Sequence, residues 1–209
     1  MVEEFKKSKI VPVAVFNEPE EALGSAKALQ EAGFNTLEIT LRTDNALECL
    51  KVVREAYPDL WLGAGTILNA ADLWRVKEMG VDFGVTPGVN PGVLEENKSV
   101  QLPLVPGVVT PGEVEQARNY GYTLLKFFPA EAAGGVKMLK ALAGPYRHIG
   151  VQFLPTGGID GSNVRSYLAL PEVVAVGGSW IVSGDFVKNR EFGKMTEFAK
   201  EARASLEDT

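Results

Sequence analysis

The feature that most constrains the fold of this sequence is a regular alternation between two kinds of segment. From Ile10 onward, short runs rich in β-branched residues alternate with longer segments of helical period, and each pair takes up about 20 to 30 residues. The alternation predicts strands at residues 11–16, 35–40, 61–65, 82–86, 102–106, 123–128, 151–155 and 173–178. Eight βα units without a linker predict an α/β fold, a (β/α)8 TIM barrel formed by a single domain over residues 1–209.

A doubly wound open sheet also alternates strands and helices and is the alternative fold. Its usual signature, GxGxxG at the start of the first helix, is missing, because the first predicted strand continues into the sequence AVFNEPEEA (14–22). Gly33, Gly80 and Gly121 each stand between a helical segment and the next strand, where a left-handed residue commonly ends a helix. We therefore favour the barrel, in which functional side chains gather at the carboxyl ends of the strands.

Composition limits the partners and the location of the chain. The formal net charge is −6 and the sequence pI is about 5.0, which argues against a general binder of nucleic acid or anionic membranes. The single cysteine, Cys49, cannot form an intrachain disulfide, and we expect it to be packed in a helix rather than reactive. The N-terminal sequence lacks the apolar core of a signal peptide, and no stretch resembles a membrane span, so we expect a cytoplasmic protein.

Lys126 is the most unusual residue of the predicted strands. Its strand is otherwise apolar apart from Thr123, and a strand covered on both faces has no place for an ammonium group. Burial disfavours the charged form of a lysine, lowers its pKa and yields a neutral amine that can attack a carbonyl and form a Schiff base. The alternative is a structural lysine that extends from the strand end to solvent or pairs with a carboxylate.

The second predicted strand supplies a carboxylate and a guanidinium for the same interior. Alternation puts Thr36, Glu38, Thr40 and Arg42 on one face and apolar residues on the other, so the polar face should point into the barrel. Glu38 could act as the acid and base of Schiff-base aldol chemistry, and Arg42 could bind the carboxylate of a keto acid with two parallel hydrogen bonds. A structural ion pair of Glu38 with Lys126 or Arg42 is the alternative.

Small residues and hydroxyl groups mark the ends of three further strands. In GAGT (63–66), glycines let a ligand approach the backbone, and the Thr66 hydroxyl can bind a carboxylate oxygen. The same residues are also common in an ordinary tight turn after a strand. The last two strands end in PTGG (155–158) and GGS (177–179). Barrels often bind phosphate through bare backbone N–H groups in the loops after these two strands and a helix N-terminus, so we expect a phosphate site rather than plain turn glycines.

The sequence offers few ligands for a transition metal. His148 is the sole histidine and Cys49 the sole cysteine, so a catalytic zinc site of the usual kind is not expected. A metal held by oxygen ligands is not excluded by this argument.

Taken together, these motifs resemble one family, the 2-keto-3-deoxy-6-phosphogluconate (KDPG) aldolases, which often also cleave 4-hydroxy-2-oxoglutarate (KHG). The resemblance covers nearly the whole chain and is carried by residues 11–13, 37–43, 63–66, 126–131, 155–158 and 177–180. It implies a class I aldolase that cleaves KDPG into pyruvate and glyceraldehyde 3-phosphate. It also implies assembly as a homotrimer and a reaction that needs no metal or organic cofactor.

By this resemblance, Lys126 forms the Schiff base with the keto acid or pyruvate, Glu38 transfers protons, and Arg42 and Thr66 hold the carboxylate. The resemblance implies further substrate-binding residues, which are Pro87, Phe128, Thr156, Gly157, Gly158, Gly178 and Ser179. The glycines and Ser179 of this set are expected to bind the phosphate.

Three other functions remain as alternatives from sequence. The first is an aldolase for the galactonate epimer of the same substrate, which differs in configuration at a single hydroxyl. The second is a phosphosugar epimerase that shares the phosphate loops but uses paired acid and base groups or a metal. The third is a phosphosugar-binding or assembly protein without catalytic activity.

Overall fold

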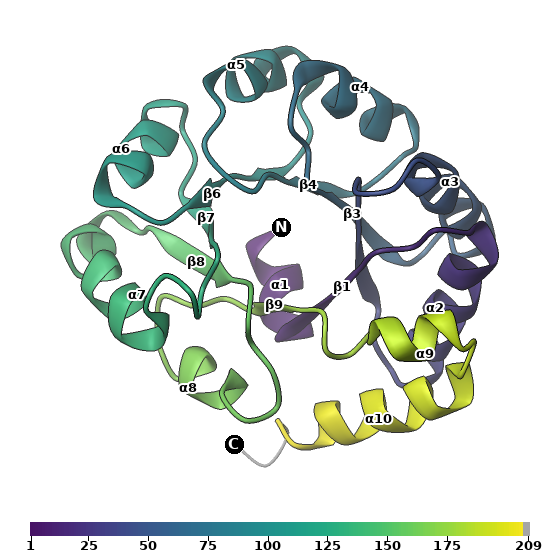
Figure 1. Ribbon diagram of the computed structural model, residues 1–209. Coiled ribbons are helices and arrows are strands. Elements are labelled where there is room, and N and C mark those ends of the chain that lie inside the picture. Colours follow the sequence, from purple (N-terminus) through teal and green to yellow (C-terminus); the bar gives the residue numbers. More distant parts are fainter. Residues whose placement is uncertain (207–209) are drawn as a thin grey trace.

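The computed structural model describes residues 1–206, which form a ring of parallel strands surrounded by helices (Figure 1). The strands are β1 (Ile10–Ala14), β2 (Thr36–Thr40), β3 (Trp61–Gly65), β4 (Phe83–Val85), β5 (Leu104–Val105), β6 (Gly107–Val108), β7 (Leu124–Phe127), β8 (Gln152–Pro155) and β9 (Val176–Gly178). Each predicted strand region overlaps one of these strands, and the fifth, which overlaps β5, leads directly into β6. The predicted barrel is confirmed.

The ring closes through one interrupted strand and two isolated bridges. Six strands pair in the order β5-β4-β3-β2-β1-β9 and three in the order β6-β7-β8. Pro106 separates β5 from β6 because proline has no backbone N–H to donate, yet its carbonyl accepts a hydrogen bond from Lys126 N at 2.8 Å. Parallel bridges from Phe153 to Val173 and from Thr156 to Gly177 connect β8 to β9. A doubly wound open sheet would lack this closure.

Helices cover the outside of the ring (Figure 1). They are α2 (Pro19–Glu31), α3 (Ala46–Ala56), α4 (Ala70–Glu78), α5 (Pro91–Val100), α6 (Pro111–Asn119), α7 (Gly135–Ala143), the 3-10 helix η1 (Gly144–Ile149), α8 (Val164–Leu168), α9 (Gly184–Lys188) and α10 (Phe192–Ala204). Gly33, Gly80 and Gly121 have φ of +83°, +71° and +89°, which confirms left-handed residues after α2, α4 and α6. Within residues 1–206, no helix combines the length and the apolar character needed to cross a membrane.

A short helix that the sequence did not reveal closes the amino-terminal end of the barrel. This helix, α1 (Val2–Ser8), is seen through the centre of the ring in Figure 1. Its Phe5 is fully buried and packs edge-on against Trp61 at 4.6 Å and Phe83 at 5.2 Å between ring centroids. Phe5 therefore fills the interior at this end of the barrel.

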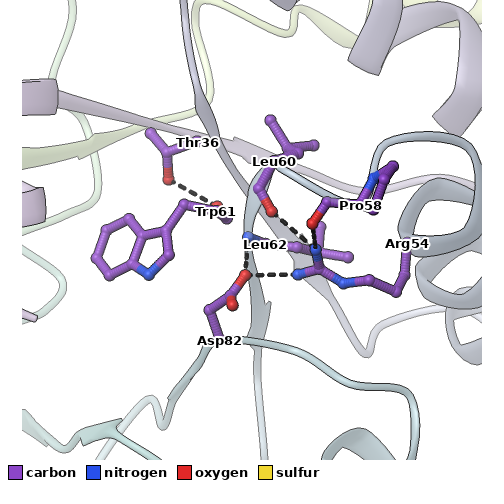
Figure 2. A network of polar contacts seen from close by, with 7 residues as sticks. All are labelled: Thr36, Arg54, Pro58, Leu60, Trp61, Leu62 and Asp82. Atoms are coloured by element: carbon purple, nitrogen blue, oxygen red, sulfur yellow. Dashed lines mark hydrogen bonds and ion pairs between the residues drawn. The ribbon is translucent and has the colours of Figure 1, made fainter.

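A polar network holds β3 and β4 in register at their amino ends (Figure 2). Asp82 Oδ2 accepts a hydrogen bond from Leu62 N at 2.8 Å and from the Arg54 guanidinium at 2.5 Å. Arg54 also donates to the carbonyls of Pro58 and Leu60, at 2.7 and 3.0 Å. The guanidinium thus joins the end of α3 to the start of β3, and this network contributes to stability at the end of the barrel away from the strand carboxyl ends.

Cys49 lies on α3 and is fully buried in the layer between helices and strands. Burial, followed by the charges of Glu21 and Glu18, raises the pKa of its thiol to about 11. The thiol therefore stays protonated near neutral pH, and the interpretation of Cys49 as a packed, unreactive residue is confirmed.

Candidate active site

Lys126 and Glu38 meet inside the carboxyl-terminal half of the barrel. Lys126 Nζ lies 3.8 Å from Glu38 Oε1, and the two side chains are 5% and 0% exposed. Leu37 and Ile39, which alternate with Glu38 on β2, are buried in the outer core beneath the helices. The predicted orientation of the second strand is therefore confirmed at Glu38, and the contact has the separation of an ion pair rather than a hydrogen bond.

The electrostatic setting of Lys126 favours a neutral amine. Burial lowers the pKa of Lys126, the carboxylate of Glu38 raises it, and the guanidinium of Arg42 lowers it. The net shift is downward. Neither oxygen of Glu38 accepts a hydrogen bond from residues 1–206. A buried carboxylate that accepts no hydrogen bond is destabilising, which argues against an ion pair with a purely structural role. Lys126 and Glu38 both remain able to exchange protons.

Glycine at position 65 makes room for Glu38. A Cβ built on Gly65 would overlap Glu38 Oε1 and would lie 2.9 Å from Cδ. On the other side of the interior, Phe128 follows β7, and its ring centroid lies 5.0 Å from Lys126 Nζ. The amine is therefore placed between a carboxylate and the face of an aromatic ring.

Arg42 and Thr66 lie together at the mouth of the barrel. Arg42 Nε donates to Thr66 Oγ1 at 3.2 Å, and Thr66 has the left-handed φ of +61° that β-branched residues rarely adopt. The sequence analysis extended the inward face of the second strand to Arg42. That extension was wrong, because β2 ends at Thr40 and Arg42 N turns back to donate to Thr40 O at 2.9 Å, so Arg42 is an exposed loop residue.

Pro87 reaches the site because two other residues hold its loop. A Cβ on Gly107 would overlap the carbonyl of Pro87, so only glycine allows this close approach. Gly107 is the register partner of Lys126 in the pairing of β6 with β7. Thr86 is fully buried and accepts from Gly107 N at 3.3 Å while donating to Gly88 O at 2.7 Å. Pro87 is thereby placed against β6, at the residue that pairs with Lys126.

The two predicted phosphate loops are neighbours. The bridge between Thr156 and Gly177 joins them, and Gly157 and Gly158 have φ of +103° and +75°. Gly178 is buried against the ring of Trp180, whereas Ser179 is exposed. The expected helix N-terminus does not follow directly, because α8 begins only at Val164, beyond a turn. Anion binding in these loops would therefore depend on backbone N–H groups rather than on the helix.

Several residues of the site had no role assigned from sequence. Gly107 and Thr86 belong to this group, and so does the pair formed by Glu131 and Tyr167 beside the Gly157 loop. A glycine between two strand residues at 107 was the one available signal for a close backbone approach. Within residues 1–206, no three His, Cys, Asp or Glu side chains are grouped so that they could hold a metal ion.

Comparison with known proteins gives consistent matches. A family model described as KDPG and KHG aldolase matches residues 1–198. The chain is 43% identical to 2-dehydro-3-deoxy-phosphogluconate aldolase of Dickeya dadantii, over 93% of this chain and 91% of that protein. It is 42% identical to KHG/KDPG aldolase of Escherichia coli K12, over 92% of this chain and 90% of that protein. Among solved structures, the chain is similar to a crystal structure of KDPG aldolase from Legionella pneumophila, in which pyruvate was captured at low pH as a covalent carbinolamine intermediate. The two sequences are 39% identical, the TM-score is 0.92, and the match covers 96% of this chain and 97% of that chain.

Proposed function

Because the chain belongs to the KDPG and KHG aldolase family and is a class I aldolase, we propose that Lys126 is the amine that forms its Schiff base. The observation that carries this assignment is a buried lysine with a lowered pKa, 3.8 Å from a buried carboxylate at the carboxyl-terminal end of the barrel. The alternatives of a phosphosugar epimerase and of a protein without catalytic activity are therefore set aside.

The reaction is the cleavage of KDPG to pyruvate and glyceraldehyde 3-phosphate. With the proton of the Lys126–Glu38 pair on Glu38, the neutral amine of Lys126 attacks the C2 ketone, and Glu38 relays a proton from the nitrogen to the oxygen to give a carbinolamine. Glu38 then donates its proton to the carbinolamine hydroxyl, which leaves as water to give an iminium ion. Glu38, again a carboxylate, then takes the proton of the C4 hydroxyl. The C3–C4 bond breaks, its electron pair forms an enamine on Lys126, and glyceraldehyde 3-phosphate departs.

The second half of the reaction returns the enzyme to its starting state. The proton held by Glu38 is transferred to C3 of the enamine, which forms the iminium of pyruvate. Water adds to this iminium at C2 while Glu38 takes its proton, and the collapse of the carbinolamine, with the hydroxyl proton relayed to nitrogen, releases pyruvate and the free amine of Lys126. One carboxylate thus serves every proton transfer, which its unpaired and buried oxygens favour.

The remaining site residues are assigned to binding. Arg42 and Thr66, which share a hydrogen bond, would hold the carboxylate of the keto acid. Pro87 and Phe128 would contact the three-carbon portion bound to Lys126, since the Phe128 ring lies 5.0 Å from Nζ and Pro87 lies against Gly107, the register partner of Lys126. The phosphate would be bound in the adjoining loops by a set of small residues, which are Thr156, Gly157, Gly158, Gly178 and Ser179.

KHG is proposed as a second substrate. It shares the keto acid and the C4 hydroxyl with KDPG but has no phosphate, so the chemistry at Lys126 and Glu38 would be the same. A relative 42% identical to this chain is named KHG/KDPG aldolase. Measuring cleavage of KDPG, its galactonate epimer and KHG side by side would give the order of preference, and we expect KDPG to be first.

Trapping with borohydride tests the assignment of Lys126. The protein is incubated with pyruvate and sodium borohydride, its intact mass is measured, and the adduct is located by peptide mapping. We expect one reduced pyruvate adduct, on Lys126, and none in Lys126→Met. Lys98→Met is the matched control, because Lys98 is an exposed lysine on α5. An adduct on another lysine, or no adduct in a folded sample, contradicts the proposal.

A homotrimer is proposed as the assembly. Leu68 and Trp74, before and on α4, are 53% and 43% exposed, and such apolar side chains are suited to contact with a second copy. Sedimentation equilibrium should give three times the mass of the chain. A monomer at micromolar concentration would refute this assembly, and Trp74→Glu should weaken it if α4 lies in the interface.

A further inference from the structure

Glu131 has no part in the proton transfers described above, yet it connects the loop after β7 to two other segments of the site. It lies between Phe127, the last residue of β7, and Gly135, the first residue of α7. Its backbone N donates to Gly157 O at 3.0 Å, and the neighbouring Ala130 N donates to Thr156 O at 2.8 Å. The segment that contains Glu131 therefore lies alongside the loop proposed to bind phosphate.

The side chain of Glu131 extends away from that loop to α8. Its Oε1 accepts a hydrogen bond from the hydroxyl of Tyr167, which is fully buried on α8. Gly135 has φ of +63°, and a Cβ there would lie 3.2 Å from Glu131 Oε1 and 3.5 Å from the Tyr167 hydroxyl. The hydrogen bond between Glu131 and Tyr167 thus lies beside the start of α7.

The pair also bears directly on the glycine loop. A Cβ on Gly158 would lie only 2.7 Å from Glu131 Cβ, so the loop backbone packs onto the stem of the Glu131 side chain. Asn163, just before α8, donates to Gly158 O at 3.0 Å. The loop is therefore held on one side by Glu131 and on the other by the residue that precedes α8.

The hydrogen bond also controls where a negative charge lies. Burial, followed by the contact with Glu131, raises the pKa of Tyr167, so the phenol stays protonated and remains a donor. A carboxylate free to turn toward the glycine loop would repel a phosphate dianion, because like charges at short range oppose each other. The Tyr167 hydroxyl draws the carboxylate toward α8 instead.

We propose that the Glu131–Tyr167 pair positions the phosphate loop at residues 156–158 and sets the preference of the enzyme for phosphorylated over unphosphorylated substrates. Both members are positioning residues, since they act through the backbone of Gly157 and Gly158. The inference rests on the proposed binding of phosphate by these glycines.

The test compares two substrates that share the reacting carbons. KM and kcat are measured for KDPG and for KHG in wild type and in Tyr167→Phe. Loss of one hydrogen bond from the supporting pair should raise KM for KDPG about tenfold. KM for KHG should change by less than about twofold, because KHG has no phosphate to bind. The kcat values for both substrates should also change by less than about twofold, because the reacting groups are untouched.

Three further variants make the outcome specific. Glu131→Ala removes the support of the loop together with the charge, so it should raise KM for KDPG selectively but by less than Tyr167→Phe, and it is measured in place of Tyr167→Phe if that variant fails to fold, since Glu131 is exposed. Glu131→Gln keeps an acceptor for Tyr167 and should stay within about twofold of wild type. Tyr146→Phe is the matched control, because it removes another tyrosine–glutamate hydrogen bond, to Glu115 at 3.2 Å.

Equal effects on both substrates, no effect on either, or a Glu131→Gln variant as impaired as Glu131→Ala would each overturn the proposal. Borohydride trapping of pyruvate on Lys126 is run on every variant. An unchanged adduct with no selectivity change refutes the positioning role alone, whereas an adduct missing from wild type refutes the assignment of Lys126 instead.

Discussion

Substituting Gly65 with alanine tests how closely the position of Glu38 controls the reaction. A Cβ at this position would lie 2.9 Å from Glu38 Cδ, which must retreat by about 0.5 Å or more to reach ordinary contact distance. The overlapping Oε1 would have to move further, by about 1 Å, and a displacement of that size costs on the order of 100-fold in rate. We therefore expect kcat for KDPG to fall about 100-fold, which corresponds to about 2.7 kcal/mol of activation free energy.

The assay follows pyruvate release, with thermal unfolding to verify that the variant is folded. Gly65 does not have a positive φ, so alanine is compatible with its backbone conformation. Glu38→Asp in the same background removes a methylene and restores space, so the loss in the double variant should be smaller than the product of the two single losses. Gly112→Ala is the control, because a Cβ there meets nothing within 4 Å. Unchanged kcat in Gly65→Ala, or losses that simply multiply, would refute the reasoning.

Three other predictions concern charge and stability. The carboxylate of Glu38 raises the pKa of Lys126 against the effect of burial, so Glu38→Gln should lower that pKa further. The pKa is measured from the ¹³Cε resonance of Lys126, and an upward shift would contradict the electrostatic account. Arg54→Met should destabilise the fold by about 2 kcal/mol in urea titration, because Asp82 loses its charged donor, with kcat unchanged. Phe5→Ala should cost about 3 to 4 kcal/mol of unfolding free energy, again with kcat unchanged in the folded enzyme; a loss below about 1 kcal/mol would show that α1 does not close the barrel.

The sequence predicted the barrel and the inner face of the site because both follow from short-range patterns. Strand and helix periods gave the eight units, and alternation along the second strand placed Glu38 inside. A lysine among apolar strand residues was a strong signal because a charge in that position needs a reason. Each of these features is determined by residues that lie within a few positions of it in the sequence.

Features that depend on distant contacts were not predicted. Phe5 is one apolar residue among charged neighbours, and nothing near it in sequence indicates that it fills the barrel end. The break at Pro106 and the approach of Pro87 to Gly107 arise from the packing of loops on adjacent strands. Likewise, Arg42 appeared to continue a strand because the alternation of polar and apolar residues extends beyond the end of β2 at Thr40.

The two ends of the barrel differ in how their charged groups are paired, and this difference separates stability from function. At the amino end, Asp82 Oδ2 has two donors within 2.8 Å, and Arg54 donates to two carbonyls, so each charged group has partners of the opposite kind within the fold. At the carboxyl end, Glu38 is wholly buried and accepts no hydrogen bond from the described residues, with only a 3.8 Å contact to Lys126. A fold selected for stability alone would replace such a carboxylate, because an unsatisfied buried charge is destabilising. Its retention is explained by a reaction in which the missing partner is the substrate.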